Sequence, residues 1–136
     1  MLVRMIDFGA EQFPVRKHPD DFGADVFMPY DDYIPAHCVA SIPLGFGLEV
    51  PFGYAGYIEP RGSVGKLGLM PVSNPIDSGY RGEVHAVMRN VTDNTIYLKK
   101  GDRIAQLVIH AGDISEFDII RPDQASATER GAGCYG

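Results

Sequence analysis

The chain has 136 residues, enough for one domain with a buried core, and its net charge of −6 without a basic run argues against a nucleic-acid groove. No apolar run approaches the roughly 20 residues of a membrane span, and the N-terminus lacks a signal-peptide pattern. We therefore expect a soluble, cytoplasmic protein with no nucleic-acid or membrane partner. The cysteines Cys38 and Cys134 are far apart and lack metal-ligand spacing, which favours free thiols.

In chain order, short apolar or alternating stretches separated by Gly and Pro predict about ten strands. The expected strands are residues 1–8, 23–27, 33–35, 39–43, 45–50, 54–59, 83–90, 95–98, 103–109 and 114–120. After residue 121 the chain is polar, with few residues able to anchor it. We therefore predict an all-β fold, a jelly-roll-like barrel or sandwich, over residues 1–121, followed by a mobile arm over residues 122–136.

The stretch from Pro75 to Glu83 combines one carboxylate, one aromatic ring and two glycines. We expect Gly79 and Gly82 to adopt backbone angles that bulkier residues avoid, so that the chain bends on both sides of Tyr80. Such bends would bring Asp77 and Tyr80 to one concave place. On this stretch alone, a surface hairpin with an exposed Asp and a core Tyr is the stronger alternative.

A second stretch, from Pro60 to Leu69, places Arg61 beside small residues whose backbone N–H groups are unobstructed. An arginine with a hydroxyl and free amides can hold phosphate groups. The alternative is a loop or short helix with Arg61 in a structural ion pair. Gln106 breaks the alternation of a later strand and is either a satisfied core amide or a ligand contact.

Five stretches in order resemble the motifs of the all-β dUTP diphosphatases (dUTPases), and the resemblance covers nearly the whole chain. They are Gly23-Ala24-Asp25-Val26-Phe27, Pro60-Arg61-Gly62-Ser63, Ile76-Asp77-Ser78-Gly79-Tyr80-Arg81-Gly82-Glu83, Gly101-Asp102-Arg103-Ile104-Ala105-Gln106-Leu107 and Arg130-Gly131-Ala132-Gly133-Cys134-Tyr135-Gly136. Each is weak by itself, whereas their order and spacing together form a strong signal.

The resemblance implies a distorted jelly-roll barrel that assembles as a homotrimer. Its active sites would lie between subunits, each closed by the C-terminal arm of another chain. The implied reaction is Mg²⁺-dependent hydrolysis of dUTP to dUMP and pyrophosphate, which removes dUTP from the nucleotide pool and supplies dUMP for dTMP synthesis. The resemblance further implies that Mg²⁺ is held by the triphosphate and water, without a direct protein ligand. A phage-encoded chain would act in the host-cell cytoplasm.

The resemblance also assigns roles to residues. Asp77 would deprotonate the attacking water, and Tyr80 would pack against the deoxyribose and exclude a 2′-hydroxyl. Asp25 and Asp102 would orient other groups of the site. The implied substrate-binding residues are Arg61, Gly62, Ser63, Asn74, Pro75, Ile76, Asp77, Tyr80, His85, Gln106, Arg130 and Tyr135. Of these, main-chain groups of residues 74–77 would pair with uracil, and the arm would supply Arg130 for phosphate and Tyr135 for the base.

The chain departs from the family pattern around the second and third motifs. Gly62 separates Arg61 from Ser63, whereas the family has Ser directly after the Arg. The segment from Arg61 to Asp77 is also shorter than usual. The related dCTP deaminases share the fold and the Arg-Ser stretch, but Val87 stands where their catalytic glutamate is expected. A deaminase-related protein, or a non-catalytic nucleotide-binding or regulatory member of the fold, is the alternative to dUTP hydrolysis.

Overall fold

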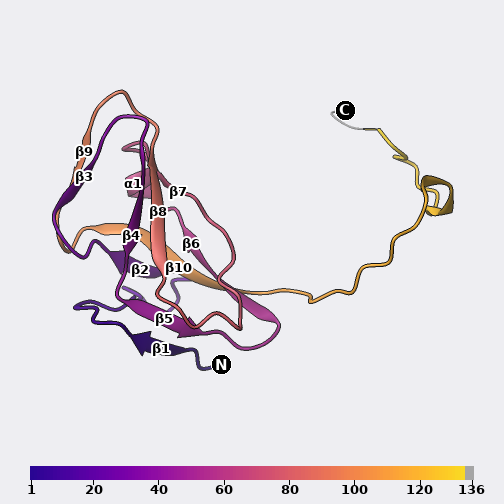
Figure 1. Cartoon of the computed structure of the whole chain (residues 1–136), viewed down its shortest axis with the longest axis horizontal. Helices are drawn as coiled ribbons and strands as arrows, with labels where there is room; N and C mark the ends of the chain where they lie inside the picture. The colour runs from indigo at the N-terminus through magenta and orange to yellow at the C-terminus, as the bar shows by residue number, and fades with distance from the viewer. Residues whose placement is uncertain (134–136) are drawn as a thin grey trace.

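Ten short strands, one helical turn and one 3-10 turn form the regular structure of residues 1–133, the part of the chain that the computed structural model describes (Figure 1). In chain order they are β1 (Arg4–Asp7), β2 (Ala24–Phe27), β3 (Asp32–Ile34), β4 (Val39–Pro43), β5 (Phe46–Glu49), β6 (Tyr54–Glu59), α1 (Gly62–Gly65), β7 (Leu69–Pro71), β8 (His85–Asn90), β9 (Ile96–Leu98), β10 (Arg103–Ala111) and η1 (Pro122–Gln124). Neither helical element is long and apolar enough to cross a membrane, and the same holds throughout residues 1–133.

The strands pair antiparallel in four small sheets, in the orders β1-β5, β2-β10-β6, β3-β9 and β4-β8-β7. Strand β10 is the longest and lies between β2 and β6, with a register shift between Arg103 and Ala105. An irregularity of this kind bends a strand and increases its local twist. The all-β barrel predicted from the sequence is confirmed, and these sheets enclose its core.

Alternate residues of the strands fill the interior, as expected when one face of each strand is buried. Phe46 and Leu48 of β5, Met88 of β8 and Ile104 of β10 are among the side chains that are almost completely buried. They belong to one continuous apolar cluster that joins the four sheets. The core therefore fixes the relative positions of β2, β6 and β10, which carry the residues discussed below.

Asn90 is a polar residue inside this core, with no exposed surface. Its Nδ2 donates hydrogen bonds to the carbonyl oxygens of Ile34, Pro35 and Asn94, at 2.9, 3.1 and 2.7 Å. Its Oδ1 accepts bonds from the backbone N–H and the hydroxyl of Thr92. A buried amide with all these partners fastens the β8–β9 turn to the end of β3.

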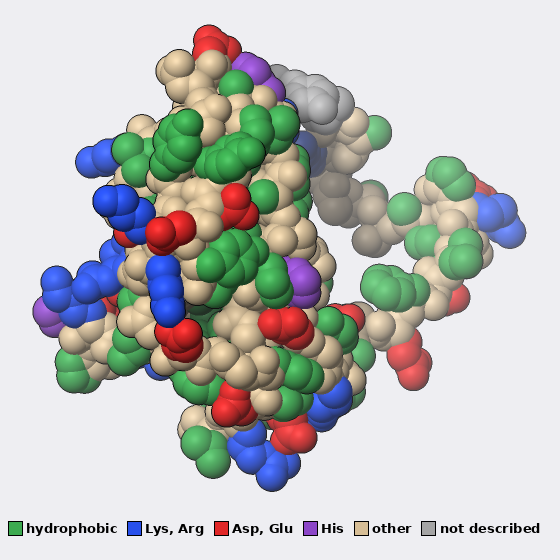
Figure 2. Space-filling view, turned by 60° about the vertical axis from the view of Figure 1, so that its left-hand side comes forward, with side chains coloured by type: hydrophobic (Ala, Val, Ile, Leu, Met, Phe, Trp, Pro, Cys, Tyr) green, Lys and Arg blue, Asp and Glu red, His purple; other side chains and the backbone are tan. Residues whose placement is uncertain are grey.

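Two strand predictions differ from the structure. Residues 114–120 do not form a strand: they leave the barrel after β10 and, within residues 1–133, lie beside no strand (Figure 1). Their apolar side chains are exposed, with Phe117 94% and Ile119 96% accessible. Figure 2 shows apolar side chains on the segment that projects from the barrel. The pattern of this segment suits a strand, but a strand also needs a partner for its backbone hydrogen bonds. Conversely β7, which follows Gly68 and ends at Pro71, was not predicted.

Candidate active site

The loop that follows β7 carries Asp77 and Tyr80 and is hydrogen-bonded to strand β6 through Ile76. Ile76 forms an isolated antiparallel bridge with Gly56 of β6, with N···O distances of 2.6 and 3.0 Å. Just after this bridge the chain turns, and the N–H of Tyr80 donates to the carbonyl oxygen of Asp77 at 3.1 Å. The turn returns the chain toward β8. It therefore holds the carboxylate and the ring on one short, exposed piece of backbone.

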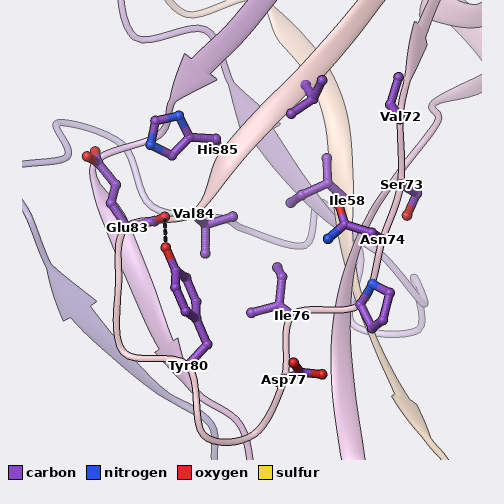
Figure 3. Close-up of a pocket in the computed structure, with 12 residues that line it drawn as sticks. Ile58, Val72, Ser73, Asn74, Ile76, Asp77, Tyr80, Glu83, Val84 and His85 are labelled. Atoms are coloured by element: carbon purple, nitrogen blue, oxygen red, sulfur yellow. Dashed lines mark hydrogen bonds between the residues drawn. The ribbon is translucent and has the colours of Figure 1, made fainter.

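This loop and the start of β8 enclose a cavity of about 330 Å³ (Figure 3). Tyr80 stands on one side of it and Ile76 on the other, with Asp77 at the foot of the loop. The Tyr80 hydroxyl donates to the carbonyl oxygen of Glu83 at 3.0 Å, which fixes the tilt of the ring. The other lining residues are Ile58, Val72, Ser73, Asn74, Pro75, Val84, His85 and Val87. The cavity thus has an apolar floor and two carboxylate residues, Asp77 and Glu83, in its lining.

The two glycines of this turn do not act as predicted, because neither Gly79 nor Gly82 adopts a positive φ in the structure. The reason for Gly82 is space: a Cβ there would lie 2.3 Å from the Tyr80 hydroxyl oxygen and 2.5 Å from Cζ. A Cβ on Gly79 would meet nothing within 4 Å. Gly82 is therefore required by the close approach of the Tyr80 ring, and Gly79 has no such constraint.

A second cavity, of about 480 Å³, lies between β2, β10 and the N-terminal end of α1. Arg61 precedes the helix, and its Nε lies 2.9 Å from Oδ1 of Asp25 on β2. Arg103 lies near the same carboxylate, with Nε 3.8 Å from Oδ2. Arg61 also donates from Nη1 to the Ser63 hydroxyl at 3.2 Å. Asp25 thus orients Arg61, which keeps part of its guanidinium surface toward the cavity.

Gln106 lines the same cavity from β10 and is held in place on both sides. Its Nε2 donates to the carbonyl oxygen of Pro60 at 2.8 Å, which joins β10 to the end of β6. A Cβ on Gly23 would lie 2.1 Å from Gln106 Oε1, so only glycine leaves the amide in this position. Gln106 is therefore not a core amide: it is half-buried at the cavity wall, with its oxygen near Gly23.

Lys17 also lines this cavity, although no sequence motif indicated it. Its loop comes beside β2 through a bridge between Val15 and Asp25, and Arg16 braces the loop by donating to the carbonyl oxygens of Asp21 and Phe22. A lysine in a polar loop carries no recognisable spacing. The Val15–Asp25 pairing is a long-range contact, so sequence periodicity could not have found this residue.

The remaining predicted site residues have mixed positions. His85 lines the first cavity, and its Nδ1 is 3.0 Å from the Ser41 hydroxyl. Asp102 lines neither cavity; its carboxylate accepts the N–H of Lys99 at 2.8 Å in the turn before β10. Arg130 is exposed on the projecting segment and donates to the carbonyl oxygen of Gly133. Tyr135 lies outside the described residues.

The two cavities share no lining residue within residues 1–133. The first offers the Asp77 and Glu83 carboxylates beside an apolar slot. The second offers the cations of Lys17 and Arg61 and the Gln106 amide, together with the carboxylates of Asp21 and Asp25. The first suits the sugar and base of a nucleotide, and the second suits its phosphates. One copy of the chain therefore carries these two sets of groups in cavities with separate linings.

The acidic residues can be tested against a magnesium ion. Within residues 1–133, no group of three or more His, Cys, Asp or Glu side chains gathers closely enough to hold a metal ion. The Asp25 carboxylate is already engaged by Arg61 and Arg103. Magnesium at nucleotide sites takes few protein ligands and is bound largely by phosphate oxygens and water. A magnesium ion at this site would therefore depend on ligands from a bound polyphosphate.

The dUTPase family model matches residues 10–136. The chain belongs to the dUTPase family. A deoxyuridine 5′-triphosphate nucleotidohydrolase of Mycobacterium marinum is 36% identical over 130 residues, covering 90% of this chain and 84% of the relative. One of Thermobifida fusca is 38% identical over 127 residues, covering 90% and 70%.

Solved structures of the dUTPase family share the fold. The G164S mutant dUTPase of Staphylococcus bacteriophage 80alpha, solved with dUpNHpp, superposes with a TM-score of 0.89 and covers 99% of this chain and 96% of that one. The dUTPase of phage phi11 of S. aureus superposes with a TM-score of 0.81, covering 88% and 96%. At 24% and 21% identity, these likenesses show the fold alone. They agree with a dUTPase barrel over nearly the whole chain.

Proposed function

We propose that this chain hydrolyses dUTP to dUMP and pyrophosphate. The observation that carries the proposal is the turn that holds Asp77 and Tyr80 at one nucleoside-sized cavity, in a chain of the dUTPase family. The cavity volume of about 330 Å³ is near the lower end of the range for small-molecule pockets, about 300–1,000 Å³, as suits a nucleoside without its phosphates. Because dUTP is a free nucleotide, the proposed site of action is the cytoplasm.

In this proposal the first cavity selects the nucleoside. The Tyr80 ring, fixed by its bond to Glu83, would pack against the deoxyribose and leave no volume for a 2′-hydroxyl. Main-chain groups of residues 74–77 would pair with the polar edge of uracil. Asp77 is exposed at the rim and would accept a proton from the attacking water as a general base.

The second cavity would hold the triphosphate. Arg61, oriented by Asp25, would contact phosphate oxygens together with Ser63 and the backbone N–H of Gly62. Lys17 adds a second positive charge to the cavity wall. A magnesium ion bound to the triphosphate would supply charge neutralisation at the transferring phosphorus. Arg61 and Lys17 would then orient the phosphate chain for attack at that phosphorus.

We further propose that each site is built from more than one subunit of a homotrimer. The separate linings of the two cavities support this, because a nucleotide needs groups from both. The exposed Phe117 and Ile119 add an apolar surface that another copy could cover. In this arrangement residues 1–121 form the barrel, and residues 122–136 form an arm that would bring Arg130 and Tyr135 to a neighbour's site.

Deamination of dCTP is disfavoured by the same cavity. Val87 of β8 lines it at the position where the related deaminases are expected to carry their glutamate. An aliphatic side chain cannot transfer protons. We therefore expect no ammonia release from dCTP, and release at a rate similar to dUTP hydrolysis would overturn the assignment.

The test is pyrophosphate release from dUTP, dCTP, dTTP and UTP in the presence of Mg²⁺. We expect turnover of dUTP alone at an appreciable rate, and equal turnover of all four would contradict nucleoside selection. Asp77→Asn should retain nucleotide binding and lower kcat by about 10²–10⁴-fold, the usual contribution of a general base. A kcat equal to that of the unaltered chain would exclude Asp77 as the base.

Sharing of sites is tested by subunit mixing. Asp77→Asn and Arg61→Gln each remove one half of every site, so each variant alone should be nearly inactive. If the halves come from different subunits, unfolding and refolding the two variants together should restore a fraction of activity, because some mixed sites receive both intact halves. No recovery from a mixture shown to contain mixed oligomers would mean that each site lies within one subunit.

A further inference from the structure

Arg81 lies directly after Tyr80, on the side of the turn away from the nucleoside cavity. Its Nη1 donates to the carbonyl oxygens of Ser78, at 2.7 Å, and Tyr80, at 3.1 Å. One charged group therefore binds two backbone acceptors of the turn that carries Asp77. Charge-assisted hydrogen bonds of this kind are stronger and more directional than neutral ones.

The Arg81 guanidinium is in turn oriented by β5. Glu49 Oε1 lies 3.6 Å from Arg81 Nε, and Glu49 Oε2 lies 2.5 Å from Nη2 of Arg4 on β1. Arg4 and Glu49 are direct partners in the β1–β5 pairing, so the carboxylate is held by a strand ladder. Together Arg4, Glu49 and Arg81 line a cleft of about 430 Å³ behind the turn, which Ser78 and Gly79 also line. A chain of alternating charges thus runs from β1 to the turn.

This arrangement includes a part of the chain outside the family match. The dUTPase family model begins at residue 10, whereas Arg4 and the whole of β1 precede it. The proposed chemistry uses the front of the turn, where Asp77 and Tyr80 face the cavity. It leaves the bonds made by Arg81 and Glu49 at the back without a role.

We infer that Arg81 is a positioning residue for the proposed dUTP hydrolysis, and that Glu49 and Arg4 orient it. The inference rests on the proposed function. Binding two carbonyl oxygens from behind fixes the curvature of residues 78–80, and the direction of the Asp77 carboxylate depends on that curvature. Asp77 has no other anchor of this kind: within residues 1–133 no hydrogen bond or ion pair to its side chain is present. The orientation of the Asp77 carboxylate therefore depends on the backbone conformation of the turn.

A positioning role predicts that loss of Arg81 changes the rate of catalysis more than the stability of the fold. Arg81 is half exposed and Arg4 more so, with side-chain accessibilities of 50% and 76%. Exposed ion pairs contribute little to the free energy of unfolding. A small error in the position of a reacting group can nevertheless lower the rate by as much as about 100-fold. Loss of Arg81 should therefore lower kcat and leave the melting temperature nearly unchanged.

The experiment compares Arg81→Gln, Arg81→Lys and Glu49→Gln with Glu11→Gln as a matched control. Glu11 forms an exposed ion pair with Lys100 at the same 2.5 Å separation as the Arg4–Glu49 pair, on another part of the barrel. We expect kcat for dUTP to fall by about 10-fold or more in Arg81→Gln, less in Arg81→Lys, and by about 3-fold in Glu49→Gln. The dissociation constant of dUpNHpp should change by less than about 3-fold in each, and Glu11→Gln should match the unaltered chain.

Chemical rescue provides the decisive measurement. In Arg81→Ala, ethylguanidinium at millimolar concentration should raise kcat, because it can occupy the vacated place and bind the same two carbonyl oxygens. It should not raise kcat in Glu11→Ala. Unchanged kcat in Arg81→Gln and Glu49→Gln would overturn the inference. It would also be overturned if the Arg81 variants lost kcat because they unfold, and if ethylguanidinium did not restore kcat in Arg81→Ala. If the unaltered chain did not hydrolyse dUTP, the proposed function itself would fail, which is a different outcome from an active chain that tolerates loss of Arg81.

Discussion

Replacing Gly82 with alanine tests the proposed sugar filter directly. The added Cβ would lie 2.3 Å from the Tyr80 hydroxyl oxygen and 2.5 Å from Cζ, whereas ordinary contact begins near 3.4 Å. The ring must therefore move by about 1 Å or swing outward, which its 47% accessibility permits. Its hydrogen bond to Glu83 would be lost at a cost of about 1 kcal/mol. Displacement of a positioning group by about 1 Å can lower the rate by as much as about 100-fold.

The assay measures kcat/KM for dUTP and for UTP, together with the melting temperature. For Gly82→Ala we expect kcat/KM for dUTP to fall by about 10–100-fold and the preference over UTP to shrink, with only a small loss of stability. Gly79→Ala is the matched control, because its Cβ would meet nothing within 4 Å and its φ is not positive. If both variants keep the rate and the dUTP preference of the unaltered chain, the Tyr80 ring does not select the sugar.

Three further outcomes are expected. Gly23→Ala should push Gln106 off the Pro60 carbonyl and lower kcat/KM by about 10-fold, whereas Gly65→Ala, which has open space, should not. Asn90→Ala should lower the free energy of unfolding by about 2 kcal/mol in denaturant titrations, because it removes the buried amide that donates to Ile34, Pro35 and Asn94. The Pro35 and Asn94 oxygens keep a second donor, from Cys38 and Thr92, and a loss below about 1 kcal/mol would contradict this prediction. Deleting residues 130–136 should lower kcat/KM by about 100-fold. The melting temperature should not change, since residues 130–133 are exposed, and a large drop would mean that the segment stabilises the fold.

Period-two alternation identified most strands, because it reports which face of a strand is buried. The pattern failed where a segment forms a strand only if a neighbouring strand pairs with it. Residues 114–120 have enough apolar side chains for a strand, but within residues 1–133 no neighbour completes their hydrogen bonds. Strand β7 is short and ends at Pro71, so its local pattern is poor, yet β8 pairs with it. Pairing is a long-range property that a local pattern does not contain.

The candidate site was predictable in its motifs and not in its spatial arrangement. Asp77 and Tyr80 share one cavity, as their closeness in sequence suggested, but Gly82 is needed for space and not for backbone angle. The sequence did not indicate Lys17, because a loop brings it to the Arg61 cavity. Nor could spacing reveal that the two cavities are separate, since this depends on how the sheets pack in three dimensions.

The single bridge between Ile76 and Gly56 has a consequence for engineering. Asn74 and Pro75 precede this bridge and Asp77 follows it. The two hydrogen bonds fix Ile76, so a rotation of the backbone on one side of Ile76 also changes the direction of the chain on the other side. Lengthening or reshaping the segment before the bridge, in order to accept another base, would also turn the segment after it. In the proposed mechanism, a change in the residues that bind the base would therefore also change kcat. A variant with a new base preference would have to be screened for both properties.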